Sequence, residues 1–150
     1  MFFVVLRRNS NCMSSEKETI LSSIRALGSK VLPAGAKLIL FGSQARNDAR
    51  EDSDWDLLIL LNDKQLQSDT FGAYAYPFVE LGWEYGTYFS PKIYTYAEWA
   101  RRKGTPFYDN VNREGMVLCW LMKKEKPFVP TLEVFLDTLE QLIREDGYLD

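Results

Sequence analysis

One stretch of the chain constrains the fold more than any other. Residues 38–61 read LILFGSQARNDAREDSDWDLLILL, so two apolar runs are separated by a polar segment that opens with Gly42-Ser43. Short runs rich in Leu and Ile, bounded by turn-forming residues, are typical of buried strands. The sequence therefore predicts two central strands, over 36–41 and 55–61, joined by a polar loop.

Helices and one further strand are predicted around these two strands. Helical spacing of apolar residues is found over 15–31, 68–82, 95–102, 106–113 and 131–147. Capping-box pairs open two of these segments, Ser15 with Glu18 and Thr95 with Glu98. A third strand is expected over 85–94, partly at a sheet edge because it contains Pro91, and 116–122 is a further apolar segment. This alternation predicts an α/β (α+β) fold with a small mixed central sheet flanked by helices.

The length of 150 residues is that of one domain. Met13 is followed by a favourable helix start, Ser14-Ser15-Glu16. Residues 1–12 are therefore interpreted as an N-terminal extension, with a short edge strand as the alternative. A single domain is expected over 13–150. Neither a signal peptide nor a membrane span is expected, because the apolar run at the start is too short and its basic residues follow it.

Composition excludes several classes of chemistry. The chain has no histidine, which removes Ser-His and Cys-His catalysis and most zinc sites. Cys12 and Cys119 lack the spacing of a metal site or a disulfide framework, so a reducing cytoplasm is expected. The net charge of -3 gives no general attraction to nucleic acid, which is not expected as a partner. Carboxylate chemistry is what remains.

The polar loop and the start of the second strand carry candidate site residues. Glycine at position 42 allows the backbone to approach a phosphate closely, and the Ser43 hydroxyl can bind a phosphate oxygen. Asp54 and Asp56 are two apart on a strand and so share one face. Two adjacent carboxylates suit Mg²⁺ carrying a nucleoside triphosphate. Arg46 is a candidate phosphate contact, with a solvated surface arginine as the alternative.

These residues resemble a known family. GSQAR followed by SDWDLLIL is similar to the signature of minimal nucleotidyltransferases in the DNA polymerase beta superfamily. The resemblance implies transfer of a nucleoside monophosphate from magnesium-bound ATP, or from another nucleoside triphosphate, to a hydroxyl acceptor. It assigns the catalytic and metal-binding roles to Asp54 and Asp56, and the phosphates of the nucleotide to Gly42 and Ser43; Arg46 stays a candidate phosphate contact. It also implies a helical HEPN-type partner protein, as in toxin–antitoxin pairs, and a homodimer is a further possibility for acceptor recognition.

The sequence departs from the family pattern at two places. Asn47 stands where the family usually has glycine, and asparagine tolerates a left-handed backbone better than most residues. Active members also use a third carboxylate on the following strand, near the place of Ser90 or Lys92 here, and residues 85–97 contain no Asp or Glu. Glu80 and Glu84 are the nearest acidic candidates. The alternative function is therefore a catalytically impaired module of the same fold that binds nucleotide or a protein.

Overall fold

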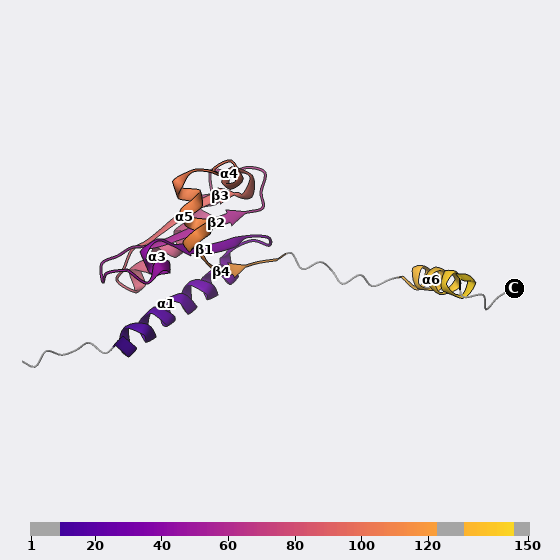
Figure 1. Cartoon of the computed structure of the whole chain (residues 1–150), viewed down its shortest axis with the longest axis horizontal. Helices are drawn as coiled ribbons and strands as arrows, with labels where there is room; N and C mark the ends of the chain where they lie inside the picture. The colour runs from indigo at the N-terminus through magenta and orange to yellow at the C-terminus, as the bar shows by residue number, and fades with distance from the viewer. Residues whose placement is uncertain (1–9, 123–130, 146–150) are drawn as a thin grey trace, which may run out of the picture.

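The mixed sheet predicted from the sequence is present. A computed structural model describes residues 10–122 and 131–145, and Figure 1 shows helices on both sides of a four-stranded sheet. In chain order the elements are α1 (Ser10–Val31), β1 (Lys37–Phe41), α2 (Ser43–Arg46), β2 (Trp55–Leu61), the π-helical turn η1 (Phe71–Ala75), α3 (Tyr76–Glu84), β3 (Phe89–Thr95), α4 (Tyr96–Ala100), α5 (Pro106–Glu114), β4 (Met116–Trp120) and α6 (Leu132–Glu145).

The strands lie in the order β3-β2-β1-β4. β1 is antiparallel to both of its neighbours, β2 and β4. β2 and β3 are parallel, which requires a crossover connection because parallel strands cannot be joined by a tight hairpin. η1 and α3 form that crossover. The mixed sheet confirms the predicted fold class, and strand 55–61 has the bounds expected from its apolar run.

Alternation along the strands divides the core between two faces of the sheet. On the first, called here the α1 face, Leu57, Ile59 and Leu61 pack with residues of α1, η1 and α3. On the second, called here the α5 face, Leu58 and Leu60 pack with residues of α4 and α5. All five of these leucine and isoleucine side chains are buried. The unbroken apolar run of β2 follows from this burial on both faces.

The first helix begins earlier than the sequence predicts. α1 starts at Ser10, so the capping box expected at Ser15 and Glu18 is wrong: the helix continues through Ser15, whose carbonyl oxygen accepts a hydrogen bond from the Thr19 hydroxyl. A capping pair inside a longer favourable helix has no free N–H groups to satisfy. Residues 10–12 of the proposed extension are thus helical, and residues 1–9 lie outside the described part of the chain.

The segment predicted as a helix over 68–82 is helical but divided. Its first part is η1, and α3 follows with Pro77 in its first turn, a position where proline's missing N–H leaves no bond unmade. α3 then runs to Glu84, so β3 starts at Phe89 and not at residue 85. Gly86, with φ 65°, makes the turn between them. β3 is an edge strand, which accommodates Pro91 as predicted.

The predicted helices after β3 are confirmed. Thr95 caps α4 by accepting the Glu98 N–H, and the Glu98 carboxylate accepts the Thr95 N–H, which completes the capping box. α5 occupies the predicted position, and the apolar segment after it is β4.

α6 is the amphipathic helix predicted at the C-terminus, although residue 147, the predicted end, lies outside the described residues. Its large apolar side chains are 39% to 73% exposed. No helix in the described ranges is long and apolar enough to cross a membrane.

Candidate active site

The turn after β1 depends on two residues with positive φ. Gly42 has φ 73° and ψ −157° and is the N-cap of α2; its carbonyl oxygen accepts the N–H groups of Ala45 and Arg46. Asn47 ends α2 in the left-handed region, with φ 62° and ψ 26°, and its N–H donates to the Ser43 carbonyl oxygen. Asparagine thus adopts the conformation expected for it in place of the family's glycine.

Gly42 also lies directly against the carboxylate of Asp56. Phe41, the residue before it, pairs with Asp56 in the β1–β2 ladder. A Cβ placed on Gly42 would meet Asp56 Oδ2 well inside 3.0 Å, a separation that real Cβ atoms essentially never show. Glycine is therefore required here by its φ and by the side chain beside it. The predicted phosphate-binding turn and one predicted metal ligand thus meet where β1 ends and β2 begins.

The two aspartates open β2 as the spacing predicts. Asp54 precedes the strand and is exposed, and Asp56 is its second residue and half-buried. Trp55, between them, is buried on the α1 face, so Asp56 lies on the α5 face. Burial raises the pKa of Asp56, and the charge of Asp54 raises it further, while Lys92 and Arg46 lower it. The aspartates are thus close enough for their charges to repel.

This donor set fits a divalent cation. Hard carboxylate oxygens are the ligands that Mg²⁺ prefers, and Mg²⁺ commonly binds through one or two carboxylates together with substrate phosphates. Asp54 and Asp56 would hold the ion, and a cation there would offset the burial and the charge repulsion that raise the pKa of Asp56.

A third acid does not join the pair. Within the described residues no group of three His, Cys, Asp or Glu side chains could hold a metal ion. Glu80 and Glu84 belong to α3, which packs on the α1 face through Phe78, and both are exposed. The strand position beside Asp56 is occupied by Ser90. The position next to Asp56 on β3 therefore carries a serine hydroxyl and not a carboxylate.

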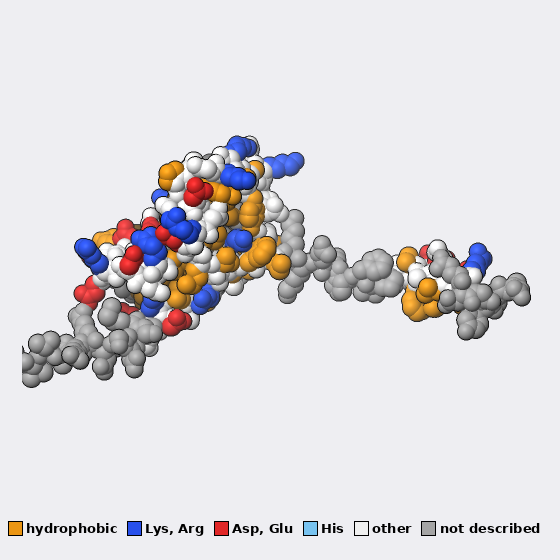
Figure 2. Space-filling model, in the orientation of Figure 1, with side chains coloured by type: hydrophobic (Ala, Val, Ile, Leu, Met, Phe, Trp, Pro, Cys, Tyr) orange, Lys and Arg blue, Asp and Glu red, His pale blue; other side chains and the backbone are white. Residues whose placement is uncertain are grey.

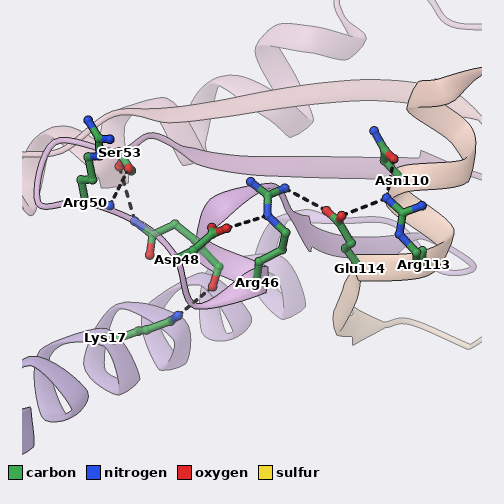
Figure 3. A network of polar contacts seen from close by, with 9 residues as sticks. Lys17, Arg46, Asp48, Arg50, Ser53, Asn110, Arg113 and Glu114 are labelled. Carbon is green, nitrogen blue, oxygen red and sulfur yellow. Dashed lines mark hydrogen bonds and ion pairs between the residues drawn. The ribbon is translucent and has the colours of Figure 1, made fainter.

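Arg46 belongs to an ion-pair network that Figure 3 shows in detail. Its Nε lies 3.1 Å from Asp48 Oδ2, and its Nη1 lies 2.9 Å from Glu114 Oε2. Glu114 also pairs with Arg113 at 3.1 Å. Its hydrogen bonds to Glu114 and Asp48 raise the pKa of Arg46. The hydrogen bonds from Arg46 and, to a smaller extent, from Arg113 lower the pKa of Glu114. This network ties α2 to the end of α5.

Lys17 is a residue of the site region that sequence reasoning missed. Its Nζ donates to the Gln44 carbonyl oxygen at 2.7 Å and to Asn47 Oδ1 at 2.6 Å; Figure 3 shows Lys17 reaching from α1 toward the α2 turn. Gln44 is itself buried, and its Nε2 donates to the Ser53 carbonyl oxygen at 3.4 Å. Contacts that span 27 and 30 residues leave no periodic signal in the sequence.

Comparison with known families agrees with this geometry. Residues 18–111 match the nucleotidyltransferase domain family, a span that runs from α1 into α5 and includes every predicted site residue. The chain belongs to this family. The resemblance to minimal nucleotidyltransferases of the polymerase-beta superfamily is thereby confirmed, and nucleotidyl transfer is the class of reaction that the family supports. No curated protein matched the chain.

Three solved structures are similar to the chain at low sequence identity. A chain of a toxin–antitoxin complex with AMP-PNP superimposes with a TM-score of 0.50 and 17% identity, over 83% of this chain and 90% of that one. A chain from the complex of a tri-AMPylated Shewanella oneidensis HEPN toxin with an MNT antitoxin gives a TM-score of 0.47 and 19% identity, over 89% and 99% of the two chains. A mutant MntA-HpeT toxin–antitoxin complex gives 0.47 and 19%, over 85% and 97%.

Proposed function

We propose that the protein is a Mg²⁺-dependent nucleotidyltransferase that transfers AMP from ATP to a hydroxyl group. The observation that carries the proposal is the contact of Gly42 with Asp56, because it joins the phosphate-binding turn to the carboxylate pair. Membership of the nucleotidyltransferase domain family supports the reaction class. AMP-PNP in a structure of the same fold supports an adenine nucleotide as the donor.

In the proposed reaction the acceptor hydroxyl loses its proton to solvent, its oxygen forms a bond to the α-phosphorus, the bond from the α-phosphorus to the β,γ-diphosphate breaks, and pyrophosphate leaves. Asp54 and Asp56 would bind Mg²⁺, which when bound would neutralise phosphate charge. Gly42 and Ser43 would hold the triphosphate through the backbone and the hydroxyl. The acceptor is proposed to be a HEPN-type helical protein, as the family resemblance implies, with a homodimer as the other route to acceptor recognition. A cytoplasmic location stays a prediction.

The test uses paired aspartate substitutions. Replacing Asp54 and Asp56 together with alanine is expected to abolish Mg²⁺-dependent pyrophosphate release and nucleotide addition to co-purified proteins, measured by mass spectrometry. The matched control replaces Asp63 and Asp69, two exposed aspartates outside the site, and is expected to retain both. Unchanged transfer in the Asp54/Asp56 variant would contradict the proposal.

A second candidate function is nucleotide binding without transfer. It is favoured by Ser90 beside Asp56, where a serine cannot serve as a metal ligand and general base as a carboxylate would. Calorimetric titration with Mg²⁺ and a panel of triphosphates distinguishes the two: binding without any pyrophosphate release supports the module, and steady release rejects it.

The Ser90→Asp variant makes this comparison sharper. It would place a third carboxylate on the strand beside Asp56, and Mg²⁺ is expected to bind about tenfold more tightly, measured by calorimetry. A Ser68→Asp substitution at an exposed loop position is the control. If the wild-type protein binds nucleotide without transfer and Ser90→Asp gains pyrophosphate release, the missing acid explains the impairment. Mg²⁺ affinity unchanged by Ser90→Asp would show that position 90 does not reach the ion.

A further inference from the structure

Besides Arg46, a second positively charged side chain lies near the site. It is Lys92, on the α5 face of the sheet. Ser90 pairs with Asp56 and Lys92 pairs with Leu58 in the parallel β2–β3 ladder. Residues two apart on a strand share a face, so Lys92 lies diagonally from Asp56 on the same side of the sheet. Neighbouring strands lie about 4.8 Å apart and each residue rises about 3.3 Å along a strand, so such diagonal neighbours are about 8 Å apart at the backbone, within reach of a long side chain.

Lys92 and Arg46 differ in their ion-pair partners. Arg46 is held by Asp48 and Glu114. Lys92 is exposed, and within the described residues no carboxylate lies within ion-pair distance of it and no hydrogen bond involves its ammonium group. The parallel register nevertheless places it on the same face as Asp56, one strand away, so a side chain of this length can reach the site. The ammonium group of Lys92 can therefore bind a ligand, whereas the guanidinium group of Arg46 is already paired with two carboxylates.

A lysine in this position would be unfavourable if the site bound only a metal ion. The positive charge of Lys92 repels a divalent cation at Asp54 and Asp56. A bound triphosphate changes the balance, because its negative charge exceeds what one Mg²⁺ neutralises. A lysine ammonium is a compact point charge with three donors, well suited to phosphate oxygens.

We propose that Lys92 binds the phosphate chain of the nucleotide, and that Arg46 instead fastens α2 to α5. The assignment rests on the proposed function, since it requires a nucleotide at Gly42 and Ser43. It makes Lys92 a substrate-binding residue supplied by the edge strand β3, opposite the turn after β1. The phosphates would then lie between the two, across the first residues of β2.

The test compares Lys92→Met with Lys92→Arg by calorimetric titration of ATP in the presence of Mg²⁺. Loss of a charge-assisted hydrogen bond predicts that Lys92→Met binds Mg²⁺·ATP roughly 10- to 100-fold more weakly. AMP, which lacks the β- and γ-phosphates, is expected to lose much less. Lys92→Arg should recover most of the ATP affinity. Lys64→Met removes an exposed lysine from the loop after β2 and should change nothing.

The sign of the effect separates this role from a purely electrostatic one. If Lys92 only repelled the metal, its removal would leave Mg²⁺·ATP binding equal or make it tighter, and either result would overturn the assignment. Thermal unfolding without ligand checks that each variant is folded. If wild-type protein binds Mg²⁺·ATP, Asp54/Asp56 alanine variants lose it and Lys92→Met retains it, the assignment of Lys92 fails and the nucleotide site stands. No binding by the wild-type protein would overturn both.

Discussion

At the scale of single residues, the site is shaped by conformations and charges that few residue types can supply. Gly42 has a backbone conformation that is essentially restricted to glycine, and it leaves no space for a Cβ beside Asp56. Asp56 is kept half-buried next to the charge of Asp54. Both features are unfavourable for stability alone and become favourable only if the turn and the carboxylates bind something.

The strain at Gly42 can be measured against another glycine. Gly42→Ala is expected to lower the free energy of unfolding by about 1–3 kcal/mol, since the backbone conformation excludes a side chain, and to abolish Mg²⁺·ATP binding. Gly72→Ala is the control, because a Cβ there would meet nothing within 4 Å; it is expected to be neutral or to stabilise by up to about 1 kcal/mol. Urea denaturation measures both. Equal effects of the two substitutions would argue against the close approach to Asp56.

The raised pKa of Asp56 predicts a pH dependence of stability with a definite sign. A carboxyl whose pKa is higher in the folded than in the unfolded state favours folding below its unfolded pKa, and this contribution is lost as pH rises through the folded pKa. Without ligand, Asp56→Asn is therefore expected to unfold at a higher temperature than the wild-type protein at neutral pH, and the difference should disappear in acid.

The same variant should bind Mg²⁺·ATP at least about tenfold more weakly, because it loses a metal ligand. Thermal unfolding across pH, with Asp63→Asn as an exposed control, tests the stability difference, and calorimetry tests the affinity. A variant that is less stable than wild type at neutral pH would contradict the cost of keeping Asp56 ionised in the folded protein.

At the scale of elements, β2 and α6 both carry a row of apolar side chains, but these rows differ in burial. Leu58 of β2 is completely buried on the α5 face beneath α4 and α5, whereas Leu136 of α6 is 53% exposed. The unbroken apolar run of β2 and the helical apolar stripe of α6 are both patterns typical of core-facing elements, yet burial is achieved only where another element covers the side chain. Helical periodicity predicts a helix reliably and does not predict what packs against it.

A pair of identical substitutions tests this difference. Leu58→Ala is expected to reduce the free energy of unfolding by about 2–5 kcal/mol, through lost burial and a cavity beside the site. Leu136→Ala is expected to change it by less than about 0.5 kcal/mol. Denaturant unfolding of the two variants gives the comparison directly. A large loss for Leu136→Ala would show that the stripe of α6 is covered in solution.

At the scale of the whole molecule, the sequence alone determined what local rules control. The bounds of β2, the place of Asp54 and Asp56 at its start, the left-handed turn at Asn47 and the capping box of Thr95 all follow from neighbouring residues. Each depends on the side-chain period of a strand or on the backbone preference of a few residues. The family resemblance was carried by two short segments, GSQAR and SDWDLLIL.

Only the tertiary structure decided which distant residues surround the site. Arg46 meets Glu114 across 68 residues of sequence. The crossover through η1 and α3 sets the parallel register that brings Ser90 beside Asp56 and Lys92 to the same face. A shift of one residue in that pairing would exchange the faces of the whole strand, and no local pattern fixes it. The sequence could therefore determine the carboxylate pair but not the cation that faces it.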